Sequence, residues 1–120
     1  MMTRIQLVTL VAIFAAMAFA ADVAGKWTAS FETQIGVQTY TYEFKVDGGK
    51  ITGSAKSNLG TAKITEGTIK GDDVSFVEML DFQGQQLRIE YKGKIAGDEM
   101  KLTRQVGDVG TEELVAKRAK

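Results

Sequence analysis

Two ionisable side chains stand at positions where the surrounding pattern is apolar. Glu78 has the same strand parity as Phe76 and Leu80, and Arg104 has the same parity as Leu102. Each charged residue is therefore expected on the same face of its strand as these apolar residues. A buried carboxylate is costly without a partner, so Glu78 and Arg104 are expected to pair if both point inward. Such a pair could hold a polar ligand. The alternatives are a bulge that turns Glu78 outward and an ion pair with a purely structural role.

Aromatic residues share these alternate positions and could stack on a sugar ring, although aromatics on one face of a strand more often form a core. Tyr42 and Tyr91 join Glu78 and Arg104 as candidate ligand-binding residues. The full aromatic set comprises Tyr40, Tyr42, Tyr91, Phe44, Phe76, Phe82 and Trp27.

Paired carboxylates could in principle hydrolyse a glycosidic bond, and Glu78, Asp81, Glu43 and Glu90 are available. Glu43 and Glu90 have outward-facing positions, however. The chain contains no histidine, which is the commonest acid–base group at neutral pH and the commonest metal ligand, and no cysteine. We therefore expect no catalytic residues, no metal site and no cofactor.

Short stretches of period-two alternation are separated by turns rich in glycine and aspartate, which is typical of antiparallel sheets. The dipeptide Gly71-Asp72 recurs as Gly97-Asp98, which indicates a repeated hairpin turn. The alternation shifts near Glu66-Gly67, where we expect a bulge. The sequence predicts an all-β fold, an up-and-down meander of about eight strands that closes into a small barrel, with an open β-sandwich as the alternative.

The first twenty residues have the features of a cleavable signal peptide. A short segment with Arg4 precedes an uncharged apolar run, and Ala18-Phe19-Ala20 provides an A-x-A cleavage site. The rival hypothesis is an uncleaved membrane anchor. Loss of Arg4 leaves 14 Lys and Arg against 15 Asp and Glu in residues 21–120, which we expect to form one nearly neutral domain. We expect it to be periplasmic or extracellular, with no stable membrane insertion after cleavage and no nucleic-acid partner.

The segment Gly25-Lys26-Trp27 and an arginine on the last strand resemble the lipocalin and calycin barrels. The resemblance implies that Trp27 closes one end of the barrel and that Arg118, with Arg104 as the alternative, packs across it. Because the chain is shorter than true lipocalins and lacks their terminal helix and cysteines, a large lipocalin-type cavity is not expected.

A second resemblance covers nearly all of residues 21–120. The pattern runs through Phe44-Lys45-Val46-Asp47-Gly48, the Gly-x-Ile-x-Gly-Asp hairpins and Ala116-Lys117-Arg118, and is similar to small secreted domains of acidobacteria and planctomycetes. It implies a compartment and a fold, and no reaction.

The leading hypothesis is a non-catalytic exported domain that binds a small apolar or carbohydrate-like ligand. The alternative is a structural or interaction module with a filled barrel that partners a larger exported protein.

Overall fold

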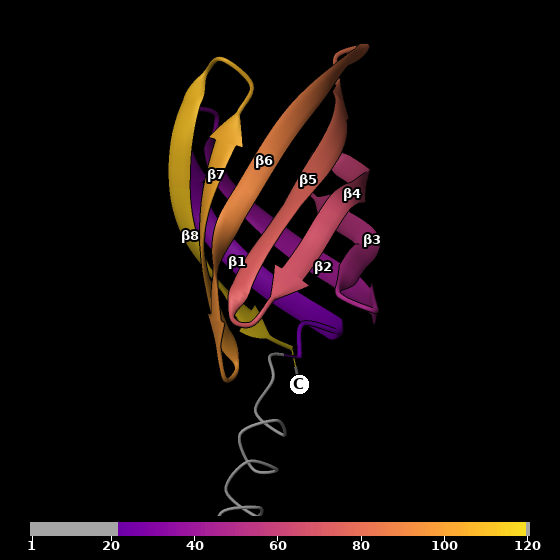
Figure 1. Cartoon of the computed structure of the whole chain (residues 1–120). Helices are drawn as coiled ribbons and strands as arrows, with labels where there is room; N and C mark the ends of the chain where they lie inside the picture. Colours follow the sequence, from indigo (N-terminus) through magenta and orange to yellow (C-terminus); the bar gives the residue numbers. More distant parts are fainter. Residues whose placement is uncertain (1–21, 120) are drawn as a thin grey trace, which may run out of the picture.

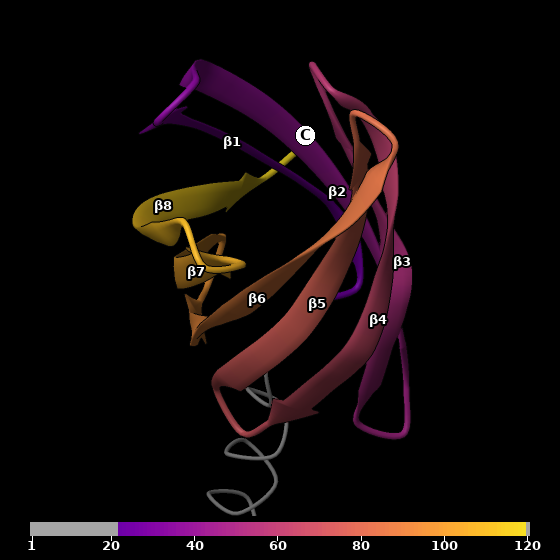
Figure 2. The same cartoon turned by 90° about the horizontal axis from the view of Figure 1, so that it is seen from above.

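The computed structural model describes residues 22–119 as eight antiparallel strands that close into a barrel in sequence order (Figures 1 and 2). This confirms the predicted all-β meander and its closure. The described part of the chain has no helix long and apolar enough to cross a membrane. The signal peptide expected over residues 1–20 lies outside the described residues. The strands are β1 (Gly25–Thr33), β2 (Gly36–Asp47), β3 (Lys50–Ser57), β4 (Gly60–Lys70), β5 (Asp73–Phe82), β6 (Gln85–Ala96), β7 (Glu99–Val106) and β8 (Gly110–Arg118).

Period-two alternation places one face of every strand inside the barrel. The aromatic residues of this face lie in the core: among the described residues, seven of the eight are buried and Phe82 is partly buried. Val46 has the same strand parity as Tyr42 and Phe44, but it lies near the end of β2 and its side chain is exposed. The β4–β5 register shifts between Thr65 and Thr68, and Glu66 has a positive φ of 51°, which confirms the expected bulge.

Gly53 and Gly93 allow neighbouring strands to approach closely. A Cβ on Gly93 would overlap the carbonyl oxygen of Lys101 on β7, and a Cβ on Gly53 would overlap that of Glu43 on β2. A strand that bends sharply toward its neighbour has no room for a side chain at such a point. These two glycines therefore permit the curvature that closes eight strands around a narrow interior.

Trp27 and Arg118 lie together at the end of the barrel where the chain enters and leaves it. The Arg118 guanidinium carbon is 4.4 Å from the centroid of the Trp27 ring, and the Trp27 indole N–H donates to the carbonyl of Val23 at 2.8 Å. Trp27 and Arg118 are also paired residues in the short β1–β8 ladder that completes the barrel. Arg118 donates further hydrogen bonds to the Asp98 carboxylate and to the carbonyls of Asp22, Ala24 and Gly97.

We predict that Trp27→Ala lowers the free energy of unfolding by about 3–5 kcal/mol, because it leaves a cavity under Arg118 and removes a fully buried ring. Urea unfolding followed by far-UV circular dichroism measures the change. Lys26→Ala, at an exposed neighbouring position, is the control and should change stability by less than about 0.5 kcal/mol. A Trp27→Ala protein as stable as this control would contradict the closing role of Trp27.

Candidate functional site

A line of polar side chains crosses the interior from β6 to β8. The strand register pairs Tyr91 with Arg104 and Arg104 with Glu112, so these three inward-facing residues are direct cross-strand neighbours. Arg104 donates from Nη1 to the Tyr91 hydroxyl and from Nε to Glu112 Oε1, both at 2.7 Å. The guanidinium is therefore bonded to both neighbouring strands.

Glu78 on β5 points inward and is fully buried, with 0% of its surface exposed. Its carboxylate accepts hydrogen bonds from the hydroxyls of Tyr40 at 2.9 Å and Tyr91 at 2.7 Å. The nearest Arg104 nitrogen is 3.8 Å from Glu78 Oε1, so the two form an ion pair bridged by Tyr91. Every carboxylate oxygen of this buried group has a partner, as a buried charge requires.

The tyrosines fix the direction of the hydrogen bonds. Burial raises the pKa of Tyr40, Tyr42 and Tyr91, so all three hydroxyls keep their protons. When Glu78 is ionised, Tyr91 donates its single proton to Glu78 and accepts from Arg104. The 3.0 Å contact between the hydroxyls of Tyr42 and Tyr91 must therefore be donated by Tyr42.

Arg104 remains charged inside the barrel. Burial lowers its pKa, but Tyr91, Tyr40 and Glu78 together raise it above the ordinary value. Its guanidinium carbon also lies 5.0 Å from the ring centroid of Phe31 and 5.1 Å from that of Tyr40, within the range of cation–π attraction. The cation is thus held by hydrogen bonds, a carboxylate and aromatic faces at once.

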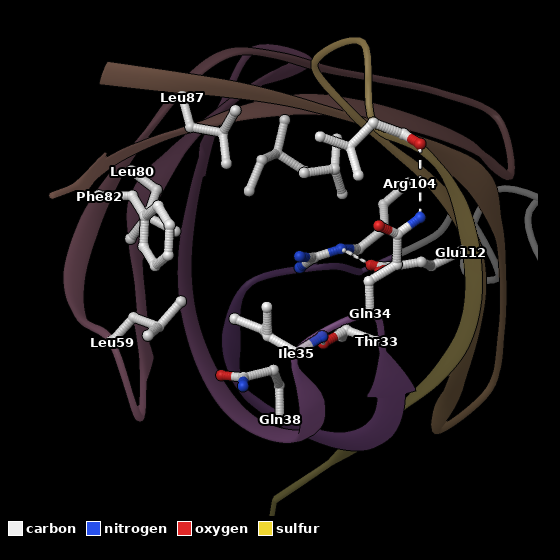
Figure 3. Close-up of a pocket in the computed structure, with 13 residues that line it drawn as sticks. Thr33, Gln34, Ile35, Gln38, Leu59, Leu80, Phe82, Leu87, Arg104 and Glu112 are labelled. Carbon is white, nitrogen blue, oxygen red and sulfur yellow. Dashed lines mark hydrogen bonds and ion pairs between the residues drawn. The ribbon is translucent and has the colours of Figure 1, made fainter. Parts of the chain in front are cut away.

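A cavity of about 130 Å³ opens at the end of the barrel opposite Trp27 and Arg118. Its walls are mostly apolar, and Arg104 and Glu112 are the only charged side chains among the residues that line it. Figure 3 shows Arg104 extending toward the middle of the ring of lining residues, joined to Glu112 by a hydrogen bond. The other lining residues are Thr33, Gln34, Ile35, Gln38, Leu59, Leu80, Phe82, Leu87, Ile89, Val106 and Val109.

The rim of the cavity carries exposed apolar side chains from the turns between strands. Ile35, between β1 and β2, is 59% exposed, and Val109, between β7 and β8, is 56% exposed. Gln34 links the same two turns by donating from Nε2 to the Val109 carbonyl at 3.4 Å. Apolar groups therefore surround the entrance, and the charged groups lie below it.

Of the four residues proposed from the sequence to bind ligand, only Arg104 lines the cavity. Glu78, Tyr42 and Tyr91 lie beneath it as the buried support of Arg104. Trp27 and Arg118 lie at the other end.

Two cavity residues were missed in the sequence, Glu112 and Gln38. Glu112 lies two residues before Leu114 on β8, and Gln38 lies two residues before Tyr40 on β2, so each faces inward like the later residue. Extending each predicted strand by two residues would have found both. Gln38 is 5% exposed, and its Oε1 has no hydrogen-bond partner among the described residues.

The four carboxylates considered for glycoside hydrolysis do not share one face of the barrel wall. Glu43, Asp81 and Glu90 are exposed on the outer face, and the inward carboxylates, Glu78 and Glu112, both contact Arg104. No group of three or more Asp or Glu residues within 22–119 is placed to hold a metal ion. No protein-family model, curated protein or solved structure matches the chain.

We predict that Glu78→Ala lowers the free energy of unfolding by about 3–5 kcal/mol, because it leaves two tyrosine hydroxyls and part of the Arg104 charge without a partner. Glu78→Gln is the matched control, since it keeps the volume and one acceptor oxygen, and it should cost clearly less. Chemical denaturation of both variants measures the difference. Equal stability of Glu78→Ala and the wild type would contradict the buried network.

Stability should also depend on pH through Glu78. Burial raises the pKa of Glu78 above its ordinary value of 4.5, against the opposing effects of Tyr91, Arg104 and Tyr40. Between 4.5 and the raised pKa, the folded protein keeps a proton that the unfolded chain has lost. The contribution of Glu78 is therefore fully present below pH 4.5 and decreases as the pH rises through the raised pKa.

Glu78→Gln has no proton to lose and removes this contribution. Unfolding of the wild type and Glu78→Gln between about pH 4 and pH 8 should show the wild type losing stability relative to the variant as the pH rises. The exposed pair of Glu66 with Arg88 does not interfere, because hydrogen bonding to Arg88 lowers the pKa of Glu66, whose contribution is lost only as the pH falls below 4.5. Parallel pH profiles would show that the proton affinity of Glu78 is not raised by folding.

Proposed function

We propose that the protein is a non-catalytic binding barrel, exported to the periplasm or the cell exterior, that takes a small and largely apolar molecule with one polar group through the open end. The observation that carries this proposal is the cavity of about 130 Å³, whose apolar walls lead down to Arg104 and Gln38. Ligand sites in proteins combine such walls with a few polar groups that orient the ligand.

The size of the cavity limits the ligand. An engineered protein cavity of about 150 Å³ lined by apolar side chains binds benzene. A space of about 130 Å³ therefore suits one aromatic ring or a short alkyl chain. The apolar walls favour such a molecule over a sugar, whose many hydroxyl groups would find few partners there.

The polar end of the cavity favours a hydrogen-bonding head group. Gln38 lines the cavity, and its Oε1 has no hydrogen-bond partner among the described residues, which leaves this oxygen to accept a hydrogen bond from the ligand. The hydrogen bonds of Arg104 to Tyr91 and Glu112 use Nη1 and Nε and not Nη2, so Nη2 of this cavity-lining residue is left to donate to a ligand. Pairing these groups would add affinity and fix the orientation of the ligand.

Two features of the sequence support export and a calycin-like class. The features of residues 1–20 favour a signal peptide, and the contact of Trp27 with Arg118 resembles the end closure of lipocalin and calycin barrels. The similarity to small secreted domains of acidobacteria and planctomycetes supports the same compartment.

An interaction module for a larger exported protein is the second candidate. It is favoured by the rim of the open end, where Ile35, Val37 and Val109 are each more than half exposed. Exposed apolar patches mark binding sites for partners as well as for ligands. In that case the rim would bind a protein surface, and small molecules would not enter the barrel.

Titration with single-ring molecules tests the proposal. We predict that toluene and benzyl alcohol shift amide NMR signals of residues around the open end and raise the thermal unfolding midpoint of the protein, since a ligand selective for the folded state stabilises it.

Val106→Trp should abolish these effects, because Val106 lines the cavity and a larger side chain there fills it. Val115→Trp is the matched control, since Val115 is an exposed residue on the outer face of β8. Absence of any response in the wild type, or an equal loss in both variants, would contradict the proposed site.

A further inference from the structure

We propose that Glu112 makes the cavity selective for uncharged ligands and excludes carboxylates, so that the bound molecule carries a hydroxyl or amide rather than an acid group. This inference rests on the proposed function and specifies its ligand class. A buried arginine at the base of an apolar cavity would by itself attract a carboxylate. The surroundings of Arg104 remove that attraction.

The charge of Arg104 is already paired on the cavity side. Glu112 Oε1 lies 2.7 Å from Arg104 Nε, and the Glu112 side chain is 15% exposed, whereas that of Arg104 is 5% exposed. A ligand carboxylate that approached Arg104 would meet the Glu112 carboxylate beside it. Because the side chains are largely desolvated, this repulsion is weakly screened.

The charge of Arg104 is also paired on the inner side. Glu78 lies 3.8 Å from Nη1 and is fully buried, and Tyr91 bridges the two. The interior therefore places one guanidinium between two carboxyl groups. With Glu78 protonated the cluster is neutral, and with Glu78 ionised it carries one negative charge. Neither state offers a free positive charge to an anion.

A neutral ligand group that both donates and accepts hydrogen bonds fits the polar groups that are not already paired. The unpaired Gln38 Oε1 accepts a hydrogen bond, and Arg104 Nη2 donates one. A hydroxyl group can donate one hydrogen bond and accept another, so it matches both kinds of group. It can do so without breaking the Arg104–Glu112 pair.

The test compares benzyl alcohol with benzoate, which have the same ring and differ in head-group charge. At about pH 7, where benzoate is ionised, NMR titration should show benzyl alcohol binding the wild type at least about tenfold more tightly than benzoate. Glu112→Gln should raise the affinity for benzoate and remove or reverse this preference. Glu113→Gln, at the exposed neighbouring position, is the matched control and should leave the preference unchanged.

The outcomes separate the two proposals. If neither compound binds the wild type, the proposed function fails and the inference fails with it. If both bind and benzoate binds as tightly as benzyl alcohol, only the inference fails. A Glu112→Gln protein that folds and still prefers benzyl alcohol tenfold would show that Glu112 has a purely structural role. If Glu112→Gln does not fold, Glu112→Ala takes its place and should change the preference in the same direction.

Discussion

Burial of the Arg104 guanidinium is the constraint on which the interior of this barrel depends. A guanidinium does not lose its proton in a protein, so the fold must supply partners for the charge. Those partners come from β5, β6 and β8, with aromatic faces from β1 and β2. They meet only when the barrel is closed and in register, since a shift of one residue would turn a partner outward. The network therefore favours one closed register over the alternatives.

Each end of the barrel contains an arginine, and the two arginines have different roles. Arg118 packs over Trp27 and bonds to surrounding carbonyls, which closes one end. Arg104 lies beneath an open end, where part of its guanidinium borders a cavity lined by apolar groups. The contacts of Arg118 serve stability, whereas the burial of Arg104 provides a polar group at the base of the cavity for a ligand.

Much of the fold and part of the site could be predicted from alternation alone. Glu78 and Arg104 stand among apolar neighbours of the same parity, so their inward orientation follows from the period of a strand. Glu112 and Gln38 obey the same rule but lie near strand ends, where the limits of a strand are uncertain in a sequence. The cavity could not be predicted, because it depends on which turns pack over an end. Val46 shows the same limit, since it has inward parity but lies exposed at the end of β2.

A crystal structure of the protein grown with benzyl alcohol tests the central claim most directly. The account predicts that the aromatic ring lies in the cavity among Leu80, Leu87 and Val106, with the hydroxyl within about 3.2 Å of Arg104 or Gln38 and the Arg104–Glu112 pair intact. A ring bound only on the outer surface, or a hydroxyl directed away from both polar groups, would contradict it.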